Sequence, residues 1–139
     1  QLFGQVYNNT EVQQINPSIS AGMVKPIGKD LNLGIWLGHV NRSGSLTERF
    51  INYFPVGLDP YELIGNPQIK AEKNNQIDLT LAWKKEKSSL NIDVFASWLT
   101  DYITSEIDTT LKPRLPASPG VRRFTNIDNA FKTGFEFRW

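Results

Sequence analysis

The chain has 139 residues, of which 40% are hydrophobic, 12% aromatic and 21% charged, and its formal net charge is +1. This length allows one domain at most, or part of a larger one. The small net charge gives no strong field toward nucleic acid or anionic lipid. The absence of cysteine excludes a disulfide framework and a thiolate metal site.

Membrane-spanning helices are excluded, because no apolar run approaches the ~18 residues that such a helix needs. A membrane β-barrel remains open, since its strands alternate in hydropathy. The chain opens with Gln1-Leu2-Phe3, and its only methionine is Met23. No basic and apolar leader is visible. We therefore expect an excised segment of a longer protein.

Alternating apolar residues predict a series of β-strands. Gln1–Tyr7 is interpreted as a strand end and Gln14–Lys25 as the first full strand. The clearest alternation runs through Leu31, Leu33, Ile35 and Leu37. Further strands are predicted over Gln76–Lys84, Leu90–Tyr102 and Thr125–Trp139.

The connections between these strands alternate in length. Pro26–Asp30 and Lys85–Ser89 are short, whereas Asn41–Asn75 and Thr104–Gly120 are long. Successive connections of a meander lie at opposite ends of the sheet, so all tight turns should share one end. Outer-membrane barrels show this asymmetry, with short periplasmic turns and long extracellular loops. A strand of about ten residues, tilted by ~40°, also matches the ~25 Å apolar band of such barrels.

One short helix is expected inside the first long connection. Ser45-Leu46-Thr47-Glu48 has the pattern of a capping box, which predicts a helix from Ser45 through Tyr53. Pro55 and Pro60 end it. Trp83 and Trp98 fall toward opposite strand ends, where an aromatic girdle would lie, although ordinary core packing also explains them.

Gly65-Asn66-Pro67 is followed by Ile69, Glu72 and then Asp78 at the start of a strand. This stretch resembles a signature in the C-terminal barrel domain of TonB-dependent outer-membrane receptors. Three further stretches are similar to the same family, in the family's order, and Phe135 departs from its usual aliphatic residue. The positions that carry the resemblance, which we expect to be structural, are Arg42, Glu48, Gly65, Asn66, Pro67, Glu72, Asp78, Asp101, Tyr102, Asn126, Gly134 and Glu136.

The resemblance implies an all-β, antiparallel up-and-down meander that is a slice of a large outer-membrane β-barrel, five or six strands long. Residues 1–139 would be a partial barrel domain without plug, signal peptide or the remaining strands. The parent would lie in the bacterial outer membrane, contact its lipid, and receive energy from TonB through the plug. It would import a scarce extracellular ligand of the metal-chelate, cobalamin or glycan class.

No catalytic, cofactor or metal site is predicted. His39 is the only histidine, and neither a Gly-x-Ser-x-Gly elbow nor a phosphate-binding Gly-Lys-Ser/Thr loop is present. Any ligand contact should come from the long loops. The candidate ligand-facing residues, for each of which a solvated surface position is the simpler interpretation, are Arg49, Tyr53, Tyr61, Arg114, Arg122 and Arg123.

A soluble antiparallel sandwich or small barrel that binds a ligand or partner is the alternative. The predicted apolar strand faces carry no charge, so they suit lipid and a protein core equally well. The sorted loops and the four ordered motifs favour the receptor family over this alternative.

The isolated chain is expected to self-associate in water, or to curl into a compact sheet. Exposing one large apolar side chain costs about 1.5–3 kcal/mol, so some ten of them would outweigh a domain's ~5–15 kcal/mol of stability. Light scattering together with binding of a hydrophobic dye measures this. A monomer that binds no dye would leave only the curled form.

Overall fold

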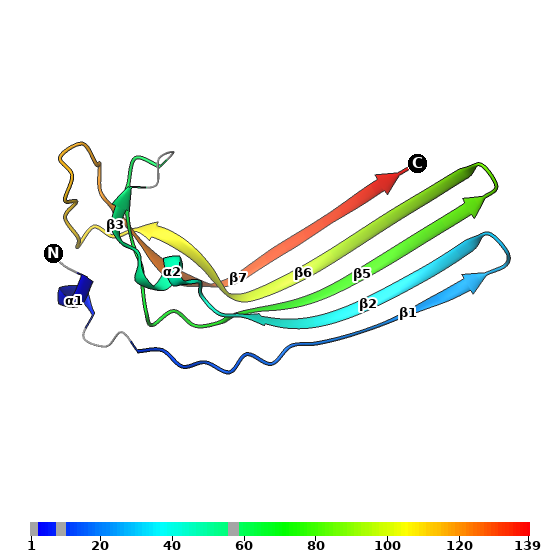
Figure 1. Cartoon of the computed structure of the whole chain (residues 1–139), viewed down its shortest axis with the longest axis horizontal. Helices are drawn as coiled ribbons and strands as arrows, with labels where there is room; N and C mark the ends of the chain where they lie inside the picture. The colour runs from blue at the N-terminus through cyan, green and yellow to red at the C-terminus, as the bar shows by residue number, and fades with distance from the viewer. Residues whose placement is uncertain (1–2, 8–10, 56–58) are drawn as a thin grey trace. The chain divides into compact units, whose positions relative to one another are not determined.

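The computed structural model describes residues 3–7, 11–55 and 59–139. Within these ranges, seven strands form one sheet in the order β1-β2-β5-β6-β7-β4-β3 (Figure 1). None of the helices in the described ranges is long and apolar enough to cross a membrane. In chain order the elements are α1 Phe3–Val6, β1 Ile19–Ile27, β2 Leu31–Arg42, α2 Leu46–Phe50, β3 Asn52–Pro55, β4 Glu62–Ile64, β5 Glu72–Lys85, β6 Ser88–Ile107 and β7 Val121–Arg138.

The chain divides into two compact units. The first, which we call the loop unit, comprises Gln1–Ile15, Arg42–Glu72 and Asp101–Asp128. The second, the strand unit, comprises Asn16–Asn41, Lys73–Thr100 and Asn129–Trp139. Both long connections belong to the loop unit, whereas the strand unit holds most of the regular sheet.

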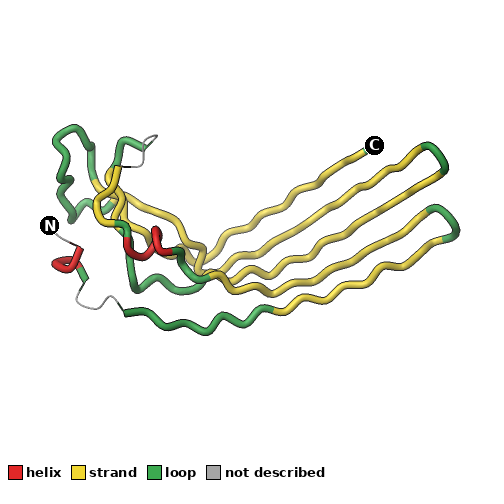
Figure 2. The backbone as a smooth tube through the Cα atoms, viewed as in Figure 1, coloured by secondary structure: helices red, strands yellow, loops and turns green. Residues whose placement is uncertain are grey.

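Two antiparallel hairpins build most of the strand unit. β1 pairs with β2 from Ile19↔His39 to Ile27↔Leu31. β5 pairs with β6 from Lys73↔Thr100 to Lys85↔Ser88. The two tight turns lie together at one end of this unit (Figure 2), where Lys84 N donates a hydrogen bond of 2.8 Å to Asp30 O. The predicted sorting of short turns to one end is therefore confirmed.

The register gathers the apolar residues on one side of the strand unit, because alternate residues of a strand share a face. We call this side the apolar face. Aromatic ring contacts extend the apolar face onto β7 and the residue after it. The ring centroids of Trp98 and Phe131 are 5.5 Å apart, and those of Trp83 and Trp139 are 6.3 Å apart. Its side chains include Ile19, Met23, Leu31, Leu33, Ile35, Leu37, Ile77, Leu79, Leu81, Trp83, Leu90, Ile92, Val94, Trp98, Phe131, Phe135, Phe137 and Trp139.

Many of these apolar side chains are exposed. Met23 is 65% exposed and Phe135 is 76% exposed. The opposite face carries polar groups, among them Asp78, which accepts a hydrogen bond of 2.8 Å from Gln76, and the ion pair between Arg138 and Asp93. The buried core of the chain lies instead in the loop unit, around Tyr7, Tyr53, Ile64 and Val121.

Three details differ from the sequence predictions. Phe3–Val6 is a single helical turn, where a strand end was expected, and Gln1 and Leu2 lie outside the described residues. The first strand begins at Ile19 rather than at Gln14. The predicted helix through Tyr53 ends at Phe50, because Ile51 turns the backbone to an extended conformation (φ −58°, ψ 136°).

The residues after this helix form the short strands β3 and β4, which no sequence pattern predicted. β3 pairs with β4 antiparallel, and β4 pairs with β7 in parallel. These two strands bring the described sheet to seven, beyond the five or six expected. Their pairing satisfies backbone N–H and C=O groups of a long connection that would otherwise lack partners. The meander of long strands β1-β2-β5-β6-β7 is as predicted.

Gly134→Ala should destabilise the strand unit. A Cβ atom at Gly134 would lie 2.6 Å from an edge carbon of the Phe95 ring, and such overpacking typically costs about 1–3 kcal/mol. Urea unfolding of the chain refolded in detergent micelles measures the loss. Gly38→Ala is the matched control, because nothing lies within 4 Å of its added Cβ. Equal unfolding midpoints for the two variants would contradict this packing.

Candidate ligand-binding site

The segment Gly65-Asn66-Pro67 is held against helix α2 in the loop unit. Gly65 N donates to Ile51 O at 2.7 Å, and a Cβ atom on Gly65 would come within 2.5 Å of Arg49 O. Only glycine fits this close approach of two backbones. Asn66 continues the contact, since its N–H donates to Glu48 O at 2.9 Å and its side chain donates to Phe124 O at 3.2 Å.

Arg42 bridges two carboxylates from different elements. Its guanidinium lies 2.9 Å from Glu48 of α2 and 3.2 Å from Glu72 of β5. Glu72 is buried and also accepts the backbone N–H of Ile103 at 3.1 Å. We call Arg42, Glu48 and Glu72 the Arg42 clamp. It joins the end of β2, the start of α2 and the start of β5 through charge-assisted hydrogen bonds.

Asn126 makes a second junction. Its side chain accepts from Lys70 N at 2.8 Å, donates to Lys70 O at 3.2 Å and donates to Asp101 O at 2.6 Å. Asp101 has a left-handed φ of 55°, uncommon for a residue other than glycine. The hydrogen bond from Asn126 and the ion pair with Lys70, at 3.6 Å, hold it in that conformation.

The capping box of α2 is formed as predicted. Ser45 N donates to Glu48 Oε2 at 2.6 Å, and Glu48 N donates to Ser45 Oγ at 3.2 Å. Burial is the largest single influence on the Glu48 carboxyl and raises its pKa. The hydrogen bonds from Arg42 and Ser45 together outweigh it, so the pKa of Glu48 lies below its ordinary value.

Two candidate ligand-facing residues are buried. Arg49 is 4% exposed, and its guanidinium donates to Pro67 O at 2.6 Å, Gly44 O at 3.2 Å and Gln14 Oε1 at 2.8 Å. Burial lowers the pKa of Arg49. Tyr53 is 5% exposed and lies in the core of the loop unit. Both side chains therefore support the loops from within.

The other four candidates lie in two pairs and one polar pocket. Arg114 is exposed, with its guanidinium carbon 5.0 Å from the centroid of the Tyr53 ring. Arg122 lies 5.9 Å from the Tyr61 ring and 2.8 Å from Asp59. The two distances from guanidinium carbon to ring centroid, 5.0 Å and 5.9 Å, are within the range of cation–π attraction. These pairs place cationic and aromatic groups on the loops.

Arg123 lines the polar pocket, which has a volume of about 180 Å³ and also includes Glu106, Thr109 and Thr125. Asp108 lies in the same pocket, 3.0 Å from Arg123. Burial is the largest single influence on the Asp108 carboxyl and raises its pKa. The hydrogen bonds from Thr110 and the charge of Arg123 together outweigh burial, so the pKa of Asp108 lies below its ordinary value. Asp108 therefore neutralises Arg123, and Glu106 leaves the lining of the pocket with a net charge of −1.

A buried carboxylate shapes the loop that carries Arg114. Glu62 is 0% exposed and accepts the backbone N–H groups of Arg114 and Leu115, each at 2.7 Å. The sequence analysis did not predict the residues that pair with the candidate arginines, which are Asp59, Asp108 and Gln14. Of these, Asp108 could have been recognised from the segment Asp108-Thr109-Thr110, because Asp commonly accepts a hydrogen bond from the backbone N–H two residues later.

The remaining family-motif positions lie in β5, β6 and β7, and Tyr102 among them belongs to the loop unit. Asp78 accepts from Gln76 on the polar face of the strand unit, and Gly134 packs against Phe95. Tyr102 is half-buried in β6, and Glu136 is exposed in β7.

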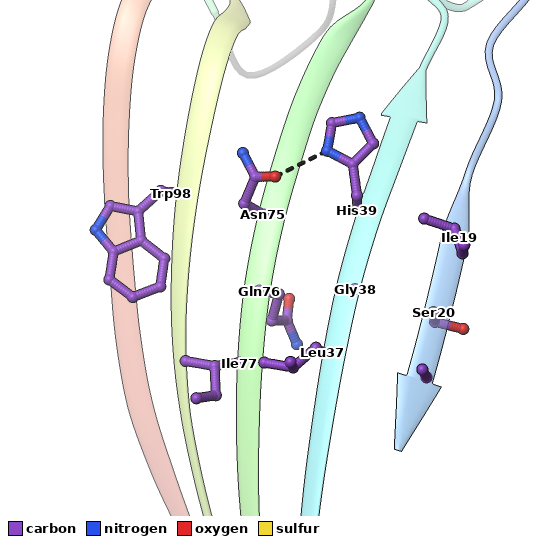
Figure 3. A pocket seen from close by; sticks show the side chains of 10 residues that line it. Ile19, Ser20, Leu37, Gly38, His39, Asn75, Gln76, Ile77 and Trp98 are labelled. Atoms are coloured by element: carbon purple, nitrogen blue, oxygen red, sulfur yellow. Dashed lines mark hydrogen bonds between the residues drawn. The ribbon is translucent and has the colours of Figure 1, made fainter.

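An apolar groove of about 500 Å³ lies on the strand unit (Figure 3). Leu37, Ile77 and Trp98 line it, and His39 Nδ1 is hydrogen-bonded to Asn75 Oδ1 at 2.8 Å on its margin. The groove is part of the apolar face, and none of its lining residues is Asp, Glu, Lys or Arg. Across the described ranges, no three His, Cys, Asp or Glu side chains are grouped to hold a metal ion.

Comparison with known families decides between the two classes left open by the sequence. The model of the family "TonB dependent receptor-like, beta-barrel" matches residues 4–139. The chain belongs to this family. The soluble sandwich is thereby excluded, and the family consists of receptors rather than enzymes. Its members are outer-membrane proteins of Gram-negative bacteria, so the predicted location is confirmed.

Solved structures of outer-membrane receptors share this fold. The siderophore receptor PirA from Pseudomonas aeruginosa matches with a TM-score of 0.69 at 15% identity, over 86% of this chain and 24% of that one. A double mutant of the Serratia marcescens hemophore receptor HasR, in complex with its hemophore HasA and heme, has a TM-score of 0.65 at 16% identity, over 88% and 19%.

A mutant of the ferric enterobactin receptor from Pseudomonas aeruginosa, in complex with enterobactin, has a TM-score of 0.63 at 14% identity, over 86% and 19%. The chain thus spans between 19% and 24% of the length of these receptors. No curated protein matches the chain.

Glu48→Gln should remove stability at neutral pH and little at low pH. Because folding lowers the pKa of Glu48 below the ordinary value near 4.5, its contribution is present above about pH 4.5. That contribution is lost as the pH falls through the folded-state pKa. Urea midpoints of the two proteins between pH 7 and pH 3 measure the difference. A gap that stays constant down to pH 3 would contradict this assignment.

Proposed function

We propose that the protein is a TonB-dependent receptor that binds an anionic metal chelate on its long loops and imports it across the outer membrane. The binding loops are those of the loop unit, and the strands are the barrel wall whose apolar face contacts lipid. Energy would come from TonB through a plug domain. No bond is made or broken in the ligand.

One observation carries the proposal: the loop unit presents arginine guanidinium groups beside tyrosine rings. Arg114 makes no hydrogen bond or ion pair through its side chain with any described residue, so its donors are available to a ligand. Guanidinium groups bind carboxylates and catecholate-type oxygens through charge-assisted hydrogen bonds. The half-buried Tyr61 ring adds flat surface for aromatic parts of a chelate.

A metal chelate is favoured over cobalamin or a glycan on two grounds. The exposed guanidinium of Arg114 suits an anion better than a neutral sugar. The structural neighbours named above are, by their titles, receptors for siderophores, ferric enterobactin or heme. Within the candidate set, we propose that Tyr61, Arg114, Arg122 and Arg123 face the ligand, while Arg49 and Tyr53 hold the loops in place.

The family-motif positions are proposed to be structural. Arg42, Glu48 and Glu72 join three elements, whereas Gly65, Asn66 and Asn126 attach the connecting segment to α2, β6 and β7. Rigid attachment keeps the ligand-facing arginines at fixed spacing, which lowers the entropy lost on binding.

Arg114→Ala in the full-length receptor should weaken binding of an anionic ferric chelate by about tenfold or more, because a charge-assisted hydrogen bond contributes ~1.5–3 kcal/mol. Quenching of intrinsic tryptophan fluorescence gives the dissociation constants for a ferric catecholate, heme, cobalamin and an oligosaccharide. Lys112→Ala is the matched control, since Lys112 is also exposed and lies in the same loop.

Equal chelate affinities of the Arg114→Ala and Lys112→Ala variants would show that Arg114 does not bind the ligand. Tight binding of the oligosaccharide alone would overturn the metal-chelate class. Loss of the unfolding transition in Arg114→Ala would be recognised by a urea titration of the same sample.

A further inference from the structure

The lysines of this chain concentrate at the tight turns of the strand unit, whereas five of its six arginines lie in the loop unit. Five of its nine lysines, Lys25, Lys29, Lys84, Lys85 and Lys87, lie in or beside the two tight turns of the strand unit. The two turns also contain two carboxylates, Asp30 and Glu86, so the formal net charge of this end is +3. The chain's overall charge of +1 conceals this concentration.

The lysines of this end are exposed, and none forms an ion pair with a described residue. Four of the six arginines differ, since each forms an ion pair with a carboxylate: Arg42, Arg122, Arg123 and Arg138. The two turns lie side by side, as the hydrogen bond from Lys84 N to Asp30 O shows. The uncompensated charge is therefore a single patch, which we call the basic end.

Two of these lysines lie on the same side as the apolar residues. Lys25 pairs with Leu33 across the β1–β2 ladder, and Lys85 follows Trp83 by two residues in β5. Alternation along the strand therefore puts Lys85 on the apolar face and Lys84 on the opposite face. A long lysine stem can lie along apolar surface while its ammonium group reaches the polar boundary.

Lys25 also lines a groove. This groove has a volume of about 500 Å³ and is formed by apolar residues of four strands, including Met23, Leu33, Leu79 and Ile92. Its lining has no other charged side chain. The volume is within the ~300–1,000 Å³ typical of ligand-binding cavities. An elongated apolar group with an anionic head fits this combination of surfaces.

The stacked rings of Trp83 and Trp139 lie on the apolar face close to the same turns. Tryptophan is enriched where the hydrocarbon of a membrane meets its polar headgroups. The basic end therefore begins where the membrane's headgroup layer is expected. Short turns of outer-membrane barrels face the periplasm, so this is the leaflet built of phospholipid.

We propose that the groove at Lys25, together with Lys85 of the basic end, binds an anionic phospholipid of the periplasmic leaflet. One acyl chain lies in the groove, and the headgroup phosphate is held by Lys25 and Lys85. A phosphatidylglycerol-type headgroup meets both requirements, whereas a zwitterionic headgroup brings no net negative charge. The inference rests on membership in the barrel family and is independent of the imported ligand.

The test uses the full-length receptor in bilayers of phosphatidylcholine containing a small fraction of spin-labelled lipid. Electron paramagnetic resonance separates lipid held at the protein surface from bulk lipid, for labelled phosphatidylglycerol and labelled phosphatidylcholine in turn. We expect a severalfold preference for phosphatidylglycerol. The variant Lys25→Gln/Lys85→Gln should lose most of it, since each lysine near an anionic group contributes about fivefold.

Lys84→Gln is the matched control, because it removes the same charge from the neighbouring residue on the opposite face and should keep the preference. In 1 M salt, where the screening length falls to ~3 Å, the unmodified receptor should lose it. That measurement needs no variant, so the test stands even if the double variant does not fold.

Equal binding of the two lipids by the unmodified receptor would overturn the proposal, as would equal loss in Lys84→Gln and in the double variant. Chelate binding by the same samples is measured in parallel. A lipid preference without chelate binding would leave this inference standing while the proposed ligand class fails, so the two outcomes are distinguishable.

Discussion

Arg42 is the residue on which the organisation of the loop unit depends. It stands at the last position of β2 and pairs at once with Glu48 of the helix cap and with the buried Glu72 at the start of β5. Twenty-nine residues of connection lie between Arg42 and Glu72. Fixing both ends of a long segment lowers its conformational entropy. Within the segment, Gly65 and Asn66 then form hydrogen bonds to the backbone of neighbouring elements.

The two units meet different physical demands. In the strand unit, antiparallel ladders satisfy the backbone, and the side chains separate into an exposed apolar face and a polar face. In the loop unit, buried and half-buried polar side chains provide the hydrogen bonds to the backbone that the ladders provide in the strand unit. Glu62, Arg49 and Asn126 bind backbone groups of residues up to 56 positions away in the chain. This division explains how a barrel wall can carry long, ordered loops.

The proposed functions of the two units rest on the same division. The loops present Arg114 and Arg122 beside tyrosine rings, while unpaired lysines gather at the tight turns. Arginine provides a planar fork for a shaped anion, whereas lysine provides a mobile point charge suited to a phosphate layer. The overall charge of +1 suggested indifference to anionic lipid. Only the folded arrangement separates the two kinds of cation.

From sequence alone, the strand positions, the sorting of loop lengths, the capping box and the family were all accessible, because alternation and turn residues are local signals. The tertiary structure decided the rest. It formed β3 and β4, buried Arg49 and Tyr53, and paired Arg122 with Asp59 across 63 positions. Such pairings depend on which distant backbone groups come together when the chain folds. No periodicity within a single segment contains that information.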